Sequence, residues 1–285
     1  SMGRGMLDAL ARPDVDAEVV VLPRDPAAFA ARAPHLAARL TLLPGDVMRF
    51  EPPTGAFTHI VHAATDASAA LNARDPLRMF DTIVTGTRRT LDFARTSGAG
   101  RVLYLSSGAV YGAQPPEITH VAEDWHGGPD PRDPRSAYGE GKRAAEMLCA
   151  IYARQFGAQV VNARIFALLG PLLTLDIHFA AGNFIRRAMA GAAIRVEGSG
   201  QAVRSYLYAA DLTTWLWTLL LDGRPGQTYN LGSEEAVSIA DLARRTAAIL
   251  GGPGVEILGR PDPGWNPRPH LPSSPKVRRD LGLTP

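Results

Sequence analysis

The sequence contains little cysteine. Cys149 is the only one among 285 residues, so an internal disulfide and a zinc site built from several cysteines are both excluded. A single cysteine is typical of a protein from a reducing compartment. Any redox chemistry must therefore come from a cofactor rather than from the chain itself.

Long apolar runs are also missing. The longest, such as residues 213–221, are well short of the roughly 20 apolar residues that a membrane-spanning helix requires. No basic segment followed by an apolar one precedes the first expected helix, so the pattern of a secretory leader is absent. We therefore expect a soluble, cytoplasmic protein with no membrane partner.

Neither sign of charge is in excess. The 30 basic and 28 acidic residues give a net charge of +2 and are spread along the sequence, without the basic block that binds nucleic acid. Lysine is nearly absent, because Lys142 and Lys276 are the only two and every other residue of the basic set is arginine. A lysine retained against this bias is a candidate for a chemical role.

Apolar runs of strand length alternate with segments of helical period in residues 1–165. Such alternation is typical of an α/β protein with a parallel sheet, and continuous apolar runs indicate strands that are covered on both faces. We predict most of a doubly wound sheet here. The expected strands are residues 18–22, 39–43, 57–63, 101–106 and 159–165, and the expected helices are 25–38, 76–97 and 137–156.

Residues 166–285 are less regular and predict a smaller α/β lobe. Pro and Gly separate its short elements, and residues 252–274 are so rich in proline that we expect an extended loop there. The expected strands are residues 194–196, 204–207 and 228–231, and the expected helices are 183–190, 209–221 and 238–251.

Tyr138 and Lys142 lie four residues apart in an expected helix and therefore share one face. An ammonium one turn away lowers the pKa of a phenol electrostatically, so the pair predicts a tyrosine that acts as a base near neutral pH. A surface pair at the same spacing is the alternative interpretation, and the spacing alone does not separate the two.

Ser106 and Ser107 come at the carboxyl end of an expected buried strand, where open α/β sheets bind ligands. Ser107 is a candidate to bind a reacting oxygen, and a turn in which serine has only a backbone role is the alternative. Another expected strand ends in His62, Ala63 and Ala64. The two alanines would let a flat cofactor approach the backbone, whereas we expect His62 to be a hydrogen-bonded core histidine.

These motifs, in this order, resemble those of the extended short-chain dehydrogenase/reductases, specifically the epimerase/dehydratase family of nucleotide-sugar enzymes. The similarity covers nearly the whole chain, and the order of the motifs is more specific than any single one. The motifs are Gly45-Asp46-Val47, Gly86-Thr87, Tyr138 with Lys142, the runs 61–64, 106–112, 164–171 and 204–211, and a tail helix at 275–283 that includes Lys276.

The resemblance implies a Rossmann-like dinucleotide-binding domain in residues 1–165 and a mainly substrate-binding lobe in residues 166–285. It makes Tyr138 the base, Lys142 the modulator of its pKa and a ligand of the nicotinamide ribose, and Ser107 the partner of the sugar hydroxyl. The substrate would be a nucleotide-diphosphate sugar held by the guanidinium of Arg204, for which a surface ion pair is the alternative role. The other implied cofactor contacts are Gly3, Arg24, Asp46, Val47, Ala63 and Ala64, and the other implied substrate contacts are Gly108, Asn183 and Arg268.

The amino terminus departs from the family. The family begins with a strand and a Gly-x-x-Gly-x-x-Gly turn whose backbone N–H groups bind the cofactor pyrophosphate, and here the match starts at Gly3, the last glycine of that turn. Ser1-Met2 resembles a cloning remnant. Either a further segment precedes residue 1 in the natural protein, or the protein lacks the first strand and most of the turn, which would weaken dinucleotide binding.

The choice of cofactor depends on the residues after the strand at 18–22. Pro23 stands where an acidic residue binds the ribose hydroxyls of NAD, and Arg24 could accommodate the 2′-phosphate of NADP. Asp25 could still reach the ribose. We expect NAD or NADP, with a slight preference for NADP.

Gly108 and Ala109 restrict the reaction. In the family, 4,6-dehydratases carry an acidic pair at these positions, and sugar-acid decarboxylases carry an acid nearby. Neither Gly108 nor Ala109 can exchange a proton, so epimerisation or ketone reduction remains. Ala167 also replaces an asparagine that is common in the family, which leaves the sugar contacts open.

We therefore predict an NAD(P)-dependent nucleotide-sugar epimerase that acts through a ketosugar and uses no metal. A ketosugar reductase that consumes NAD(P)H is the alternative, and a non-catalytic paralogue without a complete cofactor site is the second alternative. The resemblance also implies a homodimer in which the helices at 76–97 and 137–156 pair with their symmetry mates. The proline-rich loop, with Trp265 and Arg268, would help to select the nucleotide and the sugar.

Overall fold

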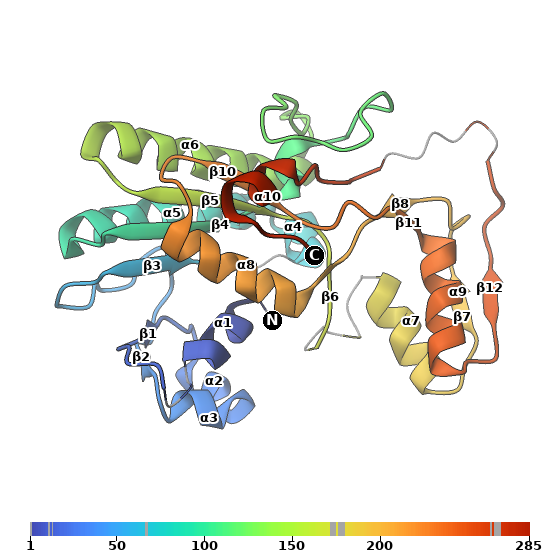
Figure 1. Cartoon of the computed structure of the whole chain (residues 1–285), viewed down its shortest axis with the longest axis horizontal. Coiled ribbons are helices and arrows are strands. Elements are labelled where there is room, and N and C mark those ends of the chain that lie inside the picture. Colours follow the sequence, from blue (N-terminus) through green and yellow to red (C-terminus); the bar gives the residue numbers. More distant parts are fainter. Residues whose placement is uncertain are drawn as a thin grey trace.

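The computed structural model of the chain describes residues 2–10, 12, 14–65, 68–171, 175, 180–262, 264 and 269–285. Its centre is a sheet with helices on both faces, and a smaller group of helices and strands lies beside it (Figure 1). No helix of the described residues combines the length and the apolar character needed to cross a bilayer.

Four parallel strands form the central sheet. They are β3 (His59–His62), β4 (Arg101–Ser107), β5 (Val160–Ile165) and β10 (Thr228–Leu231), and their order across the sheet is β10-β5-β4-β3. Their apolar runs fit strands that are covered on both faces. The predicted α/β fold with a parallel sheet is confirmed, and one of the sheet's strands comes from the second half of the chain.

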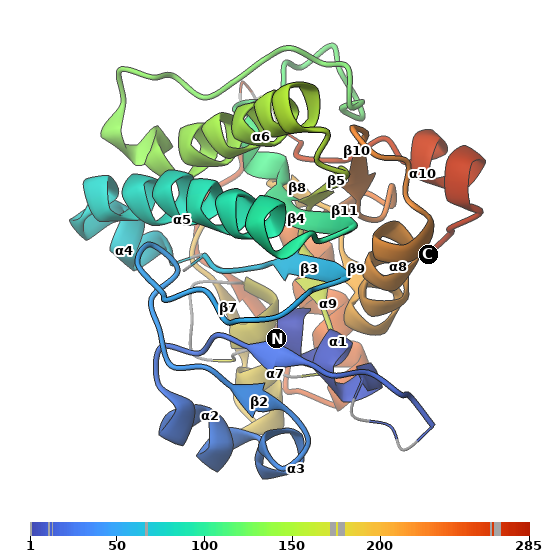
Figure 2. The same ribbon diagram turned by 90° about the vertical axis from the view of Figure 1, so that its left-hand side faces the viewer.

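Helices cover both faces of the sheet. On one face lie α5 (Pro76–Ser97) and α6 (Ala137–Phe156), and on the other lie α1 (Met2–Leu10), α8 (Ala209–Asp222) and α10 (Pro275–Leu281) (Figure 2). The side chains of β4 alternate between the two layers. Val102 and Tyr104 pack on the side of α5 and α6, whereas Leu103 and Leu105 pack on the side of α8.

The ends of α5 and α6 follow from local chemistry. A carboxylate oxygen of Asp75 accepts the backbone N–H of Arg78, and Pro76 occupies the first turn, where its missing N–H costs nothing. Both helices end in a glycine with positive φ, which is 70° at Gly98 and 69° at Gly157. The boundaries predicted for these two helices, 76–97 and 137–156, are confirmed.

Residues 14–50 form a smaller unit beside the sheet. Its two strands, β1 (Val20–Val21) and β2 (Thr41–Leu42), pair with each other, and the described strands include no ladder between β1 and β3. The single helix expected at 25–38 is wrong, because Pro34 divides it into α2 (Pro26–Arg32) and α3 (Pro34–Ala37).

The second half of the chain supplies the smaller group of elements. The helices α7 (Ala180–Met189) and α9 (Ile239–Leu250) share an apolar cluster with β7 (Ile194–Val196) (Figure 1). Parallel pairing with β7 makes residues 255–257 a strand, β12 (Val255–Ile257), so the prediction of an extended loop there is wrong. The single strand expected at 204–207 is also wrong, because two short strands lie there. The first is β8 (Val203–Arg204), which pairs with β11 (Val237–Ser238). The second is β9 (Leu207–Tyr208), which pairs with β6 (Leu168–Leu169).

Three short elements surround the carboxyl ends of the central strands. They are the helix α4 (Ala69–Arg74) and the two 3-10 helices at Gly108–Tyr111 and Pro134–Ser136. The first 3-10 helix follows β4 directly, and the second leads into α6. This edge of the sheet therefore gathers segments that are far apart in the sequence.

Candidate functional site

Ser107 is the last residue of β4 and caps the 3-10 helix that follows. Its Oγ accepts the backbone N–H of Ala109 at 3.2 Å. This contact orients the hydroxyl at the carboxyl end of the sheet, where the sequence predicted it.

Tyr138 lies in the first turn of α6, and that turn is held by Asn72 of α4. The Oδ1 atom of Asn72 accepts the backbone N–H of Tyr138 at 3.0 Å, and its Nδ2 donates to the carbonyl of Arg135 at 2.8 Å. The Ser107 hydroxyl acts on the Tyr138 phenol so placed, and this interaction favours the ionised form of the phenol. Nothing in the spacing of the motifs pointed to Asn72, which contributes from 66 residues away.

Lys142 is buried, with 3% of its surface exposed, one turn after Tyr138. Its Nζ donates to the carbonyl of Leu105 at 2.7 Å and to Oγ1 of Thr65 at 3.1 Å, and it lies 5.9 Å from the centre of the Tyr138 ring. The structure thus brings together Ser107, Tyr138 and Lys142, and a surface pair is excluded for the two helical residues.

The electrostatics of this group differ from the expectation. Burial raises the pKa of Tyr138, and the Ser107 hydroxyl only partly opposes this. Burial also lowers the pKa of Lys142 to about 7, so its charge is only partly retained at neutral pH. Burial therefore opposes the effect on the phenol pKa that the sequence predicted for Lys142, and that effect stays a prediction.

His62 is the core histidine that the sequence predicted. It is 4% exposed, and its ring nitrogens contact Oγ1 of Thr87 at 2.9 Å and Oγ1 of Thr90 at 3.4 Å. Burial, with a smaller effect of Lys142, lowers its pKa to about 3. His62 is therefore a neutral structural group at physiological pH.

The residues predicted to bind the cofactor occupy different environments. Ala63 is exposed just after β3 and Ala64 is half-buried beside it. One carboxylate oxygen of Asp46 accepts the backbone N–H of Met48 at 2.9 Å. Val47 is buried, and its methyl groups come so close to Gly86 of α5 that an added Cβ there would lie 2.8 Å from one of them.

Two further predicted cofactor residues lie at the ends of short elements. Gly3 is in the first turn of α1, and Arg24 is exposed after β1. Asp25 caps α2, where its Oδ1 accepts the N–H of Ala28 at 2.9 Å. Its carboxylate thus has a structural role beside the one considered from the sequence.

The predicted substrate residues come from both halves of the chain. Gly108 lies beside Phe166 and His270, and an added Cβ would be 2.8 Å from each of these rings. Arg204 is half-buried in β8, where its Nη1 donates to the carbonyl of Val203 at 2.7 Å.

Asn183 is the fourth residue of α7, and its Oδ1 accepts from Arg186 at 3.2 Å. Arg268 lies outside the described residues.

His270 is a residue of this region that the sequence analysis missed. Its ring packs against Phe166 in a tilted arrangement, with 4.9 Å between ring centres, and its backbone bridges to Arg204. Burial, followed by the charge of Arg204, lowers its pKa to about 4. A neutral imidazole therefore stands next to Gly108, brought there by a segment more than 160 positions later in the chain.

The nicotinamide side of this edge fits a dinucleotide. Lys142 Nζ makes two hydrogen bonds within the described residues, and an ammonium can donate three, so one donor can serve a ribose hydroxyl. The small side chains of Ala63 and Ala64 leave the backbone after β3 accessible. On the pyrophosphate side, the described residues contribute Gly3 at the start of α1.

Comparisons with known proteins agree with this geometry. Residues 1–232 match the NAD dependent epimerase/dehydratase family. UDP-glucuronic acid decarboxylase 1 of Xenopus tropicalis is 34% identical over 226 residues, which are 79% of this chain and 52% of the relative. UDP-glucuronic acid decarboxylase 3 of Arabidopsis thaliana is 33% identical over 247 residues, which are 87% of this chain and 70% of the relative. The chain thus spans about half the length of the first relative.

A solved structure has the same fold. It is a double mutant of dTDP-glucose 4,6-dehydratase from Streptomyces venezuelae with NAD bound, and its TM-score is 0.80 at 24% identity, over 100% of this chain and 88% of that one. The family model covers most of the chain, and Ser107, Tyr138 and Lys142 meet at the edge of the sheet where the motifs placed them. The chain therefore belongs to the NAD dependent epimerase/dehydratase family.

Proposed function

We propose that this chain is an NAD-dependent nucleotide-sugar epimerase that acts through a ketosugar. One observation carries the proposal: the Ser107 hydroxyl, the Tyr138 phenol and the Lys142 ammonium meet at the carboxyl ends of β3 and β4. Residues 1–165 bind the dinucleotide, and residues 166–285 mainly bind the substrate.

Tyr138 removes the proton of a sugar hydroxyl. Burial opposes the phenolate, so the Ser107 hydroxyl and the charge on Lys142 have to favour it. NAD⁺, when bound, supplies the hydride acceptor and a positive ring that favours the same phenolate. Ser107 holds the oxygen of the resulting ketone, and Tyr138 returns the proton once the sugar has presented its other face.

Gly108 and Ala109 support an epimerase over the activities named for the relatives. Dehydration and decarboxylation in this family are associated with acidic residues at or near these two positions. Here His270 and Phe166 occupy the space into which a side chain at position 108 would extend. The imidazole is neutral, with a pKa of about 4, and does not replace a carboxylate.

The substrate is a nucleotide-diphosphate sugar whose diphosphate binds Arg204. The planar guanidinium offers five N–H donors, and the contact of Nη1 with Val203 fixes its orientation. Holding the diphosphate lets the sugar turn without leaving the site. Asn183 adds a further phosphate contact, and Gly108 lets the sugar approach the end of β4.

NAD is the cofactor we propose. The preference for NADP rested on Pro23 and Arg24, and the comparisons add no support for it, whereas the family model and the dehydratase structure both refer to NAD. Ala63 and Ala64 would line the cofactor cleft, and Asp46 and Val47 would flank the adenine. A ketosugar reductase that consumes reduced cofactor uses the same three residues and is therefore the main competing outcome.

The test incubates the purified protein and its Tyr138→Phe variant with UDP-glucose, UDP-glucuronic acid and dTDP-glucose in D₂O. An epimerase converts a sugar to its epimer without net consumption of NAD and without solvent deuterium on the inverted carbon, and the variant loses turnover while it still binds UDP. Release of CO₂ from UDP-glucuronic acid would show a decarboxylase, stoichiometric use of NADH would show a reductase, and full activity of the variant would exclude Tyr138 as the base.

We also propose that the protein is a homodimer that pairs α5 and α6 with their symmetry mates. Large apolar side chains are exposed on these helices, namely Leu77, Met147, Ile151 and Phe156. Large apolar side chains exposed on neighbouring helices are typical of an interface. Light scattering at micromolar concentration should give a dimer for the natural sequence and a monomer for a Met147→Glu, Ile151→Glu double variant.

A further inference from the structure

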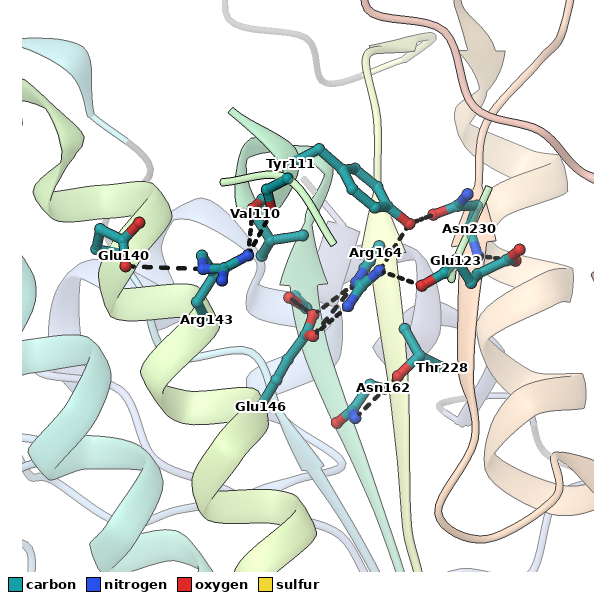
Figure 3. Close-up of polar contacts among 12 residues, drawn as sticks. Val110, Tyr111, Glu123, Glu140, Arg143, Glu146, Asn162, Arg164, Thr228 and Asn230 are labelled. Carbon is teal, nitrogen blue, oxygen red and sulfur yellow. Dashed lines mark hydrogen bonds and ion pairs between the residues drawn. The ribbon is translucent and has the colours of Figure 1, made fainter. Parts of the chain in front are cut away.

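Glu146 lies one turn beyond Lys142 on α6 and joins the helix to the sheet. Its carboxylate accepts from Nε of Arg164 at 3.0 Å and from Nη2 of Arg164 at 2.7 Å, so the pair is bidentate (Figure 3). The hydroxyl of Ser106 also donates to Glu146, at 2.5 Å. The carboxylate is thus bound by two adjacent strands, because Ser106 and Arg164 are register partners on β4 and β5.

The guanidinium of Arg164 also forms hydrogen bonds with residues other than Glu146. Its Nη1 donates to the Tyr111 hydroxyl at 2.7 Å and to the Glu123 carbonyl at 3.1 Å. The Tyr111 hydroxyl in turn donates to Oδ1 of Asn230 at 2.7 Å (Figure 3). The Arg164 and Glu146 side chains are only 14% and 12% exposed. The cluster is therefore a buried, hydrogen-bonded support behind the end of β4.

This cluster is adjacent to each of the three proposed catalytic side chains. Ser106 lies between Leu105, whose carbonyl accepts from Lys142, and Ser107, whose hydroxyl acts on the Tyr138 phenol. On the helix, Glu146 is four positions after Lys142 and eight after Tyr138. A shift of α6 along β4 would therefore have to break the contacts of Glu146 with Ser106 and Arg164.

The charges around Lys142 give Glu146 a second effect. The titratable groups that face Lys142 are His62 on β3, Tyr104 on β4, and Tyr138, Glu146 and Cys149 on α6. Burial keeps His62 neutral by lowering its pKa to about 3, and it keeps the two phenols and the thiol neutral by raising their pKa values. Glu146 is thus the one carboxylate that faces Lys142 in the part of the chain that the structure describes.

We propose that Glu146, fixed by Arg164 and Ser106, is a positioning residue that keeps α6 in register with β4 and keeps Lys142 charged. The inference rests on the proposed function, because the charge of Lys142 matters only if Tyr138 is the base. Without the carboxylate, the buried ammonium loses its compensating charge, and its pKa falls further below the ordinary value. Lys142 would then be neutral at the pH at which it has to favour the phenolate.

The two lysines of the chain allow this to be measured directly. Protein labelled with ¹³C at lysine Cε gives two side-chain signals, and a Lys276→Arg variant assigns the one from Lys142. The Lys142 signal should titrate with a midpoint near 7 in the natural sequence. In Glu146→Gln the midpoint should move to lower pH, and the alkaline limb of the activity profile should move in the same direction.

Tyr111→Phe is the matched control. It removes a hydroxyl that bonds Arg164 and Asn230, but burial raises the pKa of Tyr111 to about 12, so no charge is lost at neutral pH. The control should be less stable and should leave the Lys142 midpoint unchanged. If Glu146→Gln and Tyr111→Phe have the same midpoint as the natural sequence, the charge role of Glu146 is refuted.

A second variant covers the case in which Glu146→Gln does not fold. Glu146→Asp retains the charge but withdraws it by one methylene, so the midpoint should fall less than for the amide, and the pH profile should be partly restored. A midpoint in Glu146→Asp as low as in Glu146→Gln, or above that of the natural sequence, would overturn the proposal. The titration requires no substrate, so it separates failure of this inference from failure of the proposed function, which Tyr138→Phe tests.

Discussion

The central sheet with its helices and the amino-terminal unit of residues 14–50 differ in strand length and in how much core they bury. The central sheet has four strands of four to seven residues, with α5 and α6 on one face and α8 on the other. The amino-terminal unit has two strands of two residues each and a cluster in which only Ala33, Leu36 and Leu40 are fully buried.

The residues proposed for catalysis all lie in the sheet region. Ser107, Tyr138 and Lys142 belong to the sheet region, where neighbouring elements fix each of them by at least one contact. Arg24 and Asp46, proposed from sequence for the cofactor, belong to the amino-terminal unit. A reacting centre needs side chains held to a fraction of an ångström, whereas groups that bind the far end of a cofactor tolerate more freedom.

The largest expected effect tests the buried ion pair of the sheet region. Arg164→Ala leaves the Glu146 carboxylate buried without its partner and should lower the free energy of unfolding by about 3–5 kcal/mol. The matched change in the amino-terminal unit is Asp14→Asn, which breaks the exposed pair of Asp14 with Arg12 and should have no measurable effect. Urea unfolding of both variants checks this, and equal losses would contradict the distinction between the two regions.

A core substitution in each region sharpens the comparison. Leu103→Ala removes a fully buried side chain between β4 and α8 and should cost about 2–5 kcal/mol. Leu42 of β2 is only partly buried, so Leu42→Ala should cost under about 2 kcal/mol. Thermal and urea unfolding give the two values, and a larger loss for Leu42→Ala would show that the amino-terminal unit is the better packed of the two.

The last expected effect, at most about 1.4 kcal/mol for each pH unit, concerns acid stability, which should originate in the sheet region. Below pH 6.5 an unfolded histidine binds a proton, but folded His62 does not do so until about pH 3. Stability contributed by neutral His62 is thus complete above pH 6.5 and is lost as the pH falls toward 3, with a slope of up to about 1.4 kcal/mol per pH unit. His62→Gln should flatten this slope in urea unfolding at several pH values, and an unchanged slope would assign it to other groups.

How far the sequence predicted the structure depended on whether the signal was local. Asp75, Pro76 and Gly98 mark the ends of α5 within a few residues, and both long helices were predicted with the boundaries observed. Pro34 is a local signal too, and its effect on the helix at 25–38 was missed. The strand β12 could not be predicted from its own residues, because it exists through pairing with β7, some 60 positions earlier.

The candidate site follows the same rule. The four-residue spacing of Tyr138 and Lys142 and the position of Ser107 after an apolar run were visible in the sequence, whereas the contributions of Asn72 and His270 were not. Each of the latter two reaches the site from a distant segment, and neither belongs to a motif with fixed spacing. Whether Arg204 binds the diphosphate remains a prediction.

The sequence by itself determined which chemical groups are available and which of them share a helix face or a strand end, since both follow from period and order along the chain. Only the tertiary structure decided their charge, because the pKa of Lys142 depends on how deeply α6 is buried and on the carboxylate of Glu146 beside it. It also decided their support, since Arg164 and Ser106 reach that carboxylate from two neighbouring strands. Desolvation and long-range contacts arise only when distant segments pack together, and no local pattern encodes them.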